Sequence, residues 1–205
     1  GMVAYFVGPY LAMAMANLGE FIRVSTELQP FLMGIAVSVL MGIILTLPIS
    51  SAALSIILSL SGLAAGAATV GCSAQMIGFA VISFKANGWN GLLAQGLGTS
   101  MLQVPNIMKK PIIWLPPIIA SAILGPLATL VFKMQNNPAG GGMGTSGLVG
   151  QLMTWQTMSG QMDKIHLLII ILFLHIILPA VLSLIVANIM KKRGLIKDED
   201  YKLDL

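Results

Sequence analysis

Neutral polar residues are concentrated in one stretch of the chain, residues 136–151, with the sequence NNPAGGGMGTSGLVGQ. Six of its sixteen residues are glycine and none is charged, so it is a poor helix former that can expose backbone N–H and C=O groups. Such groups, together with amides and hydroxyls, suit a neutral, hydroxyl-rich solute such as a sugar or polyol. The alternative is a flexible loop outside the membrane, where glycine is also common. The candidate binding residues are Asn136, Asn137, Gly142, Gly144, Thr145, Ser146 and Gln151.

Other chemistries find less support in the sequence. Residues 142–147, GMGTSG, match the spacing of a dinucleotide-binding loop, but that loop needs a preceding strand and an acid about 20 residues further on. Leu167 stands at that later position, so we reject a nucleotide site. The single cysteine, Cys72, excludes an internal disulfide and a cysteine-rich metal site. We find no nucleophile–base pair, and we predict no catalytic residue, cofactor or metal in this chain.

His175 is the one ionisable residue well inside the last apolar segment. An ionisable group within a membrane segment is a candidate functional residue, so His175 joins the candidate solute site. The alternative is a neutral imidazole bonded to a neighbouring helix. Pro179 lies four residues further on and removes the helical hydrogen-bond donor for the His175 carbonyl, so a kink is expected here.

Acidic residues are absent from position 28 to position 162. Ion-coupled pumps usually keep a carboxylate in the middle of the membrane, and cation channels often carry an acidic ring. The sequence therefore argues against both kinds of protein.

The composition indicates a polytopic membrane protein. The chain is 57% hydrophobic and 9% charged, with a mean hydropathy of +0.91, whereas soluble domains carry about 25% charged residues. Its net charge of +4 arises at the ends of apolar segments, where orientation signals lie, and does not indicate nucleic-acid binding.

A membrane-spanning helix needs about 20 mostly apolar residues. This rule predicts an all-α bundle of about six spans with re-entrant or broken helices. The expected break between the third and fourth spans lies near residues 66–71, and residues 89–102 and the second half of 134–166 are expected to be re-entrant, interfacial or half-helices. We predict one transmembrane domain, residues 1–190, and a cytoplasmic tail, residues 191–205, which is expected to be a solvated end, with contact to a cytoplasmic partner as the alternative. The predicted spans are residues 2–18, 31–48, 51–69, 70–84, 111–133 and 167–190.

The distribution of lysine and arginine predicts the orientation. With a cytoplasmic C-terminus, residues 85–110 also lie inside, and 134–166 lie outside. Eight basic residues are then inside and three outside, as the positive-inside rule requires. The inside set is Lys85, Lys109, Lys110, Lys191, Lys192, Arg193, Lys197 and Lys202, and the outside set is Arg23, Lys133 and Lys164.

Segment 136–151, together with SGLAAGAATVGCSAQMIGFA at 61–80, resembles the phosphotransferase-system EIIC type 2 family, which includes proteins named as perfringolysin regulators. The resemblance implies a sugar permease component of the bacterial plasma membrane, commonly dimeric. The phosphoryl-donor residues of such systems lie on separate EIIA and EIIB units. Gln75, in the second stretch, joins the candidate site. Known EIIC sugar sites use a Glu and a His; the central region here has no Glu, so His175 corresponds by chemistry alone.

Three hypotheses follow. The chain is a permease component that binds and moves a neutral solute, a membrane regulator that binds a solute without moving it, or a scaffold whose glycines only pack helices. Gly62 and Gly66 form a GxxxG pair that suits close helix contact. Family members are commonly longer, so the chain is either a short member or the C-terminal part of a longer unit. A permease predicts a polar cavity at mid-membrane depth beside 136–151, and a scaffold predicts a segment that is exposed or fully packed.

Overall fold

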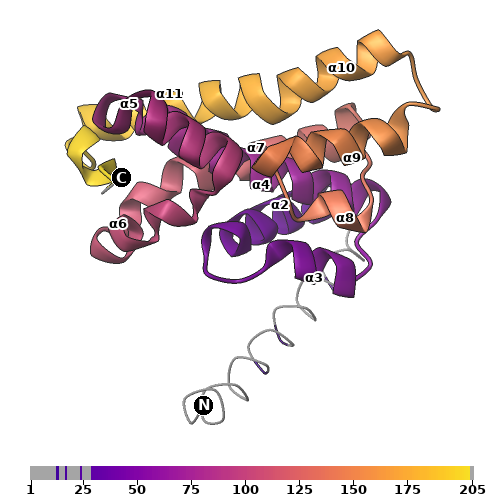
Figure 1. The fold of residues 1–205 in the computed structure, drawn as a ribbon, viewed down its shortest axis with the longest axis horizontal. Coiled ribbons are helices and arrows are strands. Elements are labelled where there is room, and N and C mark those ends of the chain that lie inside the picture. The colour runs from indigo at the N-terminus through magenta and orange to yellow at the C-terminus, as the bar shows by residue number, and fades with distance from the viewer. Residues whose placement is uncertain (1–12, 14–16, 18–23, 25–28, 204–205) are drawn as a thin grey trace.

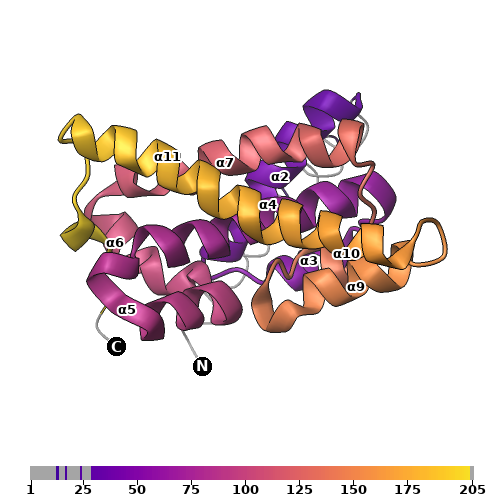
Figure 2. The ribbon, with the colours of Figure 1, turned by 90° about the horizontal axis from the view of Figure 1, so that it is seen from above.

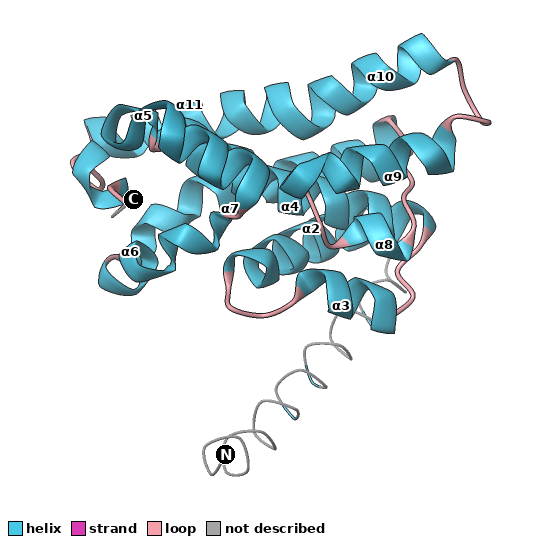
Figure 3. Ribbon diagram, viewed as in Figure 1, coloured by secondary structure: helices cyan, strands magenta, loops and turns pink. Residues whose placement is uncertain are grey.

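The computed structural model describes residues 13, 17, 24 and 29–203. The first predicted span, residues 2–18, and the polar link that follows it fall almost wholly outside this range. The described part consists of helices joined by loops and contains no strand (Figure 1, Figure 3). Its elements are α2 (Pro30–Thr46), α3 (Ser51–Ile57), α4 (Gly62–Ile82), α5 (Phe84–Leu93), η1 (Ala94–Gly98), η2 (Ser100–Gln103), α6 (Val104–Lys109), η3 (Pro111–Trp114), α7 (Leu115–Pro126), η4 (Leu127–Val131), α8 (Pro138–Gly141), η5 (Ser146–Leu148), α9 (Val149–Met158), α10 (Lys164–Leu172), η6 (Phe173–Ile177), α11 (Leu178–Lys192) and η7 (Asp198–Tyr201).

Three continuous helices in the described part are long and apolar enough to cross a membrane. They are α4, the run from η3 to η4 and the run from α10 to α11, and α2 is a shorter apolar helix beside them. The α10–α11 run lies along the whole length of the bundle (Figure 2). We call the end that holds residues 193–203 the tail end, and the end that holds residues 159–163 the far end. All-α membrane architecture is therefore confirmed.

Side-chain contacts fix the directions of these helices. Ser38 Oγ donates to Ser121 O at 2.8 Å, and Thr129 Oγ1 donates to Pro30 O at 2.8 Å, so α2 and α7 are antiparallel. Thr46 Oγ1 bonds Gln75 Oε1 at 3.4 Å, which places the end of α2 beside the middle of α4. The chain then returns through α3 to the far end, where α4 begins. α2 and α3 thus form a hairpin whose turn lies near the middle of α4.

Small residues let the central helices approach closely. A Cβ on Gly71 would lie 1.9 Å from Ser38 O, one on Gly125 would lie 2.0 Å from Gly34 O, and one on Gly66 would lie 2.0 Å from Met134 O. Helices in membranes associate through such contacts, because lipid supplies no hydrophobic drive between them. Gly66, one glycine of the predicted GxxxG pair, therefore makes its close contact within this chain, against Met134.

The predicted break near residues 66–71 is wrong, because α4 is one continuous helix from Gly62 to Ile82. The small residues that suggested a break face close neighbours from α2, α7 and the segment after η4. Hydroxyls also bond within the helix: Thr69 Oγ1 donates to Ala65 O and Ser73 Oγ to Thr69 O, both at 2.8 Å. Contacts with neighbouring segments stabilise the helix at its glycines. Those neighbours are distant in the sequence, so the spacing of the glycines does not reveal them.

Two connections fold back into the bundle from opposite ends. From the tail end, α5 and η1 return beside α4, so that a Cβ on Gly96 would contact Ala80 at 3.4 Å. From the far end, the backbone of Asn136 pairs with Gly62, and the chain descends until Gly144 meets Cys72 before α9 returns. Both connections therefore turn back against α4, and their re-entry into a membrane stays a prediction.

The C-terminal tail is packed, so the expectation of a solvated end was wrong. Tyr201 is fully buried, and its Oη donates to Ile113 O at 3.0 Å. Two aspartates of the tail have lysine partners: Lys110 Nζ lies 2.7 Å from Asp200 Oδ2, and Lys191 pairs with Asp198. These contacts place the tail and residues 85–110 at one end of the bundle, as the charge count predicts. The compartment that this end faces stays a prediction.

Candidate solute-binding site

Three irregular segments meet around an open cavity of about 200 Å³, at whose mouth Ser50, Gly98 and Met101 are exposed. They are the turn between α2 and α3, the tip of the re-entrant segment from the tail end, and the tip of the glycine-rich segment from the far end. No charged side chain is among the lining residues. These are Leu45, Ile49, Ser50, Ser51, Ala52, Met76, Gly98, Thr99, Met101, Gly142, Met143 and Ser146.

Short hydrogen bonds join the three segments to one another. Ser51 Oγ donates to Gly142 O at 2.6 Å, which ties the α3 turn to the glycine-rich tip. Thr145 Oγ1 donates to Gly96 O at 2.6 Å, which ties the two re-entrant segments together. Thr46 Oγ1 lies 2.9 Å from Ser100 Oγ, which ties α2 to the tip from the tail end. Each wall of the cavity is therefore positioned by the other two.

The lining combines hydroxyl groups with soft apolar surface. Ser50 Oγ accepts from Ala53 N at 3.2 Å and Thr99 Oγ1 accepts from Met101 N at 3.1 Å, so both hydroxyls keep their own proton to donate. Met76 and Met143 supply adaptable thioether side chains. Irregular backbone at membrane depth is tolerated where it is buried in protein or lines a cavity. This wall can hydrogen-bond a neutral polar molecule and also pack against its carbon skeleton.

Asn136 holds the two legs of the glycine-rich segment together. Its Nδ2 lies 2.7 Å from Thr69 Oγ1, 3.1 Å from Gly150 O and 3.0 Å from Thr154 Oγ1. Its Oδ1 accepts from Asn137 N at 2.8 Å. Since the Asn136 amide is buried and its donors and acceptor are engaged, it fixes the shape of the segment.

Replacing Asn136 by alanine is expected to destabilise the fold by about 2–4 kcal/mol, because several buried partners lose their hydrogen bonds at once. Unfolding of the detergent-solubilised protein measures this loss. The matched control is Asn137→Ala, since Asn137 Oδ1 caps α8 by accepting from Gly140 N at 3.0 Å. Loss of a cap costs about 1 kcal/mol. Equal effects of the two substitutions would contradict this account of Asn136.

A buried polar cluster lies behind the glycine-rich tip. Gln151 Nε2 lies 3.3 Å from Ser73 Oγ and 3.3 Å from His175 Nδ1. His175 is fully buried in the π-helical turn η6, so it makes the contact with a neighbouring helix that its alternative interpretation predicts. Among the described residues, His175 Nε2 and Gln151 Oε1 have no hydrogen-bond partner. The cluster therefore contains buried polar atoms that can form a further hydrogen bond.

Gln75 joins α4 to two neighbours near the cavity. Its Oε1 accepts from Trp114 Nε1 at 2.9 Å and from Thr46 Oγ1 at 3.4 Å. Its Nε2 finds no partner within the described part of the chain. Met76, the next residue, lines the cavity. Gln75 therefore lies beside the site without being part of its wall.

The structure separates the predicted site residues by position. Gly142 and Ser146 line the cavity, Gly144 and Thr145 make the contacts of the tip, and Gln75, Gln151 and His175 lie behind or beside it. Asn136 and Asn137 hold the legs. The hydroxyl-bearing lining residues that sequence reasoning missed are Ser50, Ser51 and Thr99, and it also missed Gly98. The run PISS after α2 was a signal for the first two, since proline followed by serines marks a turn and a new helix.

Helices of membrane-crossing length around re-entrant segments define a polytopic helical membrane protein. The chain belongs to the phosphotransferase-system EIIC family: the family model described as "Phosphotransferase system, EIIC" matches residues 1–203. No curated protein and no solved structure matches the chain. Family membership confirms the resemblance seen in the sequence. It makes the protein a membrane-integral permease component of a phosphotransferase system, which works with EIIA and EIIB components.

Proposed function

We propose that the chain binds a neutral hydroxylated solute, a sugar or polyol, in the cavity at the three tips and carries it across a bacterial plasma membrane. The observation that carries this proposal is the lining of that cavity: hydroxyls and glycine backbone from three segments, apolar methionine surface and no charged side chain. A neutral molecule with many hydroxyls matches such a wall, because it both donates and accepts hydrogen bonds and brings no charge to be desolvated.

The size of the cavity favours a small solute. Pockets for drug-sized ligands measure about 300–1,000 Å³, and this cavity measures about 200 Å³. A single sugar ring or a short polyol suits this space better than an oligosaccharide. The substrate class that we propose is therefore a small neutral carbohydrate.

Translocation follows from the opposite origins of the two re-entrant segments. One reaches the cavity from the tail end and the other from the far end, and Thr145 Oγ1 bonds Gly96 O where they meet. Moving the first segment aside would open the cavity to the tail end, and moving the second would open it to the far end. We propose that these are the two gates. Phosphoryl transfer belongs to the EIIA and EIIB partners, and a homodimer and a cytoplasmic tail end remain part of the proposal.

The nine residues predicted from the sequence take different roles in this proposal. Gly142 and Ser146 touch the solute. Gly144 and Thr145 set the shape of the tip, as their contacts with Cys72 and Gly96 support. The remaining five position the segments that line the cavity and do not touch the solute. Two of them, His175 and Gln151, have polar atoms that are unpartnered among the described residues and that a gate movement could bring into contact with the solute. The scaffold interpretation describes the legs of the segment well, but it does not account for the polar cavity at its tip.

Thermal stabilisation against a panel of neutral sugars and polyols tests the proposal. A binding sugar should raise the melting temperature of the parent protein by mass action. Ser146→Ala should weaken that sugar's affinity about 5–10-fold, since it removes one hydrogen bond to the solute. Ser61→Ala is the control, because Ser61 is exposed and its side chain makes no capping bond.

Vesicle uptake then separates the remaining alternatives. Uptake of the stabilising sugar supports a permease, and binding without uptake in the presence of EIIA and EIIB components supports the regulator hypothesis. A stabilising sugar whose affinity is the same in the parent, Ser146→Ala and Ser61→Ala proteins would place the site elsewhere.

A further inference from the structure

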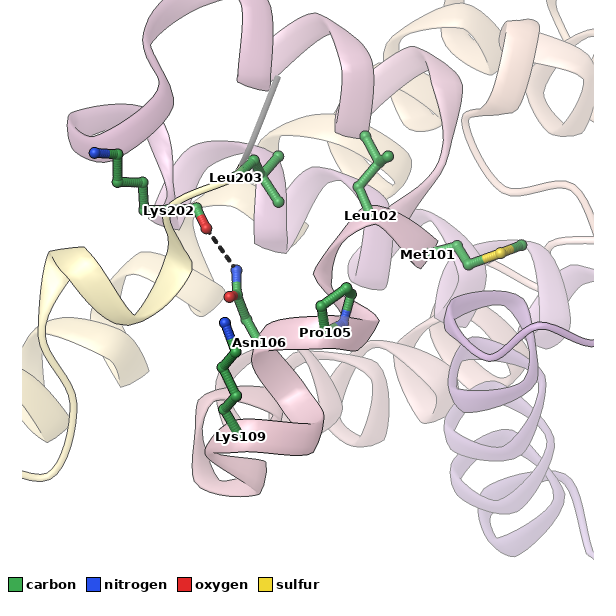
Figure 4. Close-up of a pocket in the computed structure, with 7 residues that line it drawn as sticks. All are labelled: Met101, Leu102, Pro105, Asn106, Lys109, Lys202 and Leu203. Carbon is green, nitrogen blue, oxygen red and sulfur yellow. Dashed lines mark hydrogen bonds between the residues drawn. The ribbon is translucent and has the colours of Figure 1, made fainter.

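The C-terminal segment lies in a socket built by the re-entrant segment of the tail end. Asn87 Nδ2 donates to Tyr201 O at 2.8 Å, and Gln103 Nε2 donates to the same oxygen at 3.1 Å. Asn106 Nδ2 donates to Lys202 O at 2.8 Å, as the close-up shows (Figure 4). Three amide side chains from α5, η2 and α6 therefore bind consecutive backbone carbonyls of the tail.

The socket recognises the tail as an extended peptide. Besides donating to Tyr201 O, Asn87 accepts from Leu203 N through its Oδ1 at 2.8 Å, so one amide binds a carbonyl and an N–H two residues apart. Lys202 between them has φ −65° and ψ 131°, an extended conformation. Binding main-chain groups in this way is how proteins capture peptides of extended conformation. The amides bind only backbone atoms of the tail, so sequence specificity must come from a side chain of the tail.

Tyr201 supplies that specificity. Its ring is fully buried against Phe79 with the ring centroids 6.2 Å apart, and its Oη donates to Ile113 O at 3.0 Å. A buried aromatic anchor with one satisfied hydroxyl is a typical hot spot of a binding interface. The site thus has a defined pocket for one tyrosine.

Acidic residues flank the anchor and meet basic partners. Lys110 Nζ lies 2.7 Å from Asp200 Oδ2, and Lys191 pairs with Asp198. Burial alone would raise the pKa of Asp200, but hydrogen bonds from Lys110 and from the Lys197 backbone N–H outweigh it and hold that pKa below its ordinary value. Asp200 is therefore charged at neutral pH and contributes to the register of the tail.

The connection between α11 and the socket is short and exposed. Lys192, Arg193, Gly194 and Leu195 are exposed, and Gly194 has φ +71°, a conformation that favours glycine. Rotation at this turn can release the segment without disturbing α11. The contacts that would be lost are those of Ile196 and Tyr201, the bonds of the socket amides, and the two lysine–aspartate pairs.

The socket is directly connected to the solute cavity. Gln103, which binds the tail, ends η2, and η2 begins two residues after Gly98 in the cavity wall. Met101 lines both the cavity and a hollow of about 310 Å³ beside Lys202 and Leu203 (Figure 4). A shift of η2 on release of the tail would therefore move the cavity wall.

We propose that residues 87–113 form a peptide-binding site whose ligand is the chain's own segment 195–203, and that an occupied site holds the tail-end gate in its closed position. The first half of this proposal stands on the contacts of the tail alone. The second half rests on the proposed function, in which the tip at Gly98–Met101 is a gate of the solute cavity.

Peptide binding tests the first half. A fluorescent peptide with the sequence of residues 195–203, LIKDEDYKL, is titrated onto the full chain carrying Tyr201→Ala and onto the parent. The peptide should bind the variant, whose socket is weakly occupied, and bind the parent at least about tenfold more weakly, because the tethered tail competes at high effective concentration. Replacing the peptide's tyrosine by phenylalanine should weaken binding about fivefold. A scrambled peptide that binds the variant equally well would overturn the site.

Thiol accessibility tests the second half without any solute. Ser100→Cys in a Cys72→Ala background reports on the tip, since Ser100 is fully buried while the tail is bound. Adding Tyr201→Ala should raise the alkylation rate at position 100 several-fold, and added peptide should lower the rate again. Gly160→Cys at the far end, where a Cβ is unobstructed, should react at the same rate in both backgrounds. An alkylation rate at position 100 that Tyr201→Ala and the bound peptide leave unchanged would overturn the coupling and leave the solute site to its own tests. Tyr201→Phe, which keeps the ring, controls for misfolding.

Discussion

Replacing Gly71 by leucine is expected to prevent the chain from reaching its native fold. A Cβ at this position would lie 1.9 Å from Ser38 O and 2.5 Å from Ser38 C, which are backbone atoms and cannot turn aside. Nor can α2 move away, because Gly34 and Gly125 bring it equally close to α7. Overpacking usually costs about 1–3 kcal/mol; forcing two helices apart at their closest crossing should exceed about 4 kcal/mol.

The yield of monodisperse protein in detergent and its resistance to limited proteolysis measure this effect. The matched control is Gly160→Leu, because a Cβ at Gly160 meets no atom within 4 Å and the residue is exposed at the far end. The control should behave as the parent does. A Gly71→Leu protein that folds with an unchanged melting temperature would show that α2 and α4 do not cross at this glycine.

The second large effect is expected at Gly98, where leucine should abolish solute binding and leave the fold intact. Gly98 lines the cavity, is exposed at its mouth, and has open space where a Cβ would stand. A leucine side chain would occupy much of a cavity of only about 200 Å³. We expect the affinity for a stabilising sugar to fall by at least about 30-fold, which corresponds to about 2 kcal/mol.

Isothermal titration of the parent and the variant with that sugar measures the loss, and a melting curve without sugar verifies the fold. Gly98→Ala should reduce affinity only slightly, because it adds one methyl group, and Gly160→Leu should not change it. Full affinity in Gly98→Leu would mean that the solute binds somewhere other than the junction of the tips.

The helical membrane class and the long apolar helices could be predicted from the sequence because they depend on local composition. Residues 167–190 carry no formal charge, and the structure has α10 to α11 there. The continuity of α4 could not be predicted, since its glycines are explained by atoms of Ser38 and Met134, which lie far away in the sequence. The packing of the tail was missed for the same reason: the partner of Tyr201 Oη is the carbonyl of Ile113, 88 residues earlier.

The candidate site was predictable in part. Gly142 and Ser146 belong to a segment whose composition sets it apart from its surroundings, so they could be found without a structure. Thr99 and Ser50 lie in stretches of ordinary composition, and only the meeting of three connections brings them to one cavity. A segment of unusual composition can be recognised in the sequence. The residues that face it across a site are brought there by tertiary contacts, so the sequence does not identify them.

The central claim is that the solute binds where the three tips meet. The most direct test is the alkylation rate of Gly98→Cys, in a Cys72→Ala background, with and without a sugar that stabilises the protein. If the sugar occupies the cavity, it should slow alkylation at position 98 at least about fivefold at saturation, and Gly160→Cys should react at an unchanged rate. A sugar that stabilises the protein at saturation and leaves the rate at position 98 unchanged would contradict the claim.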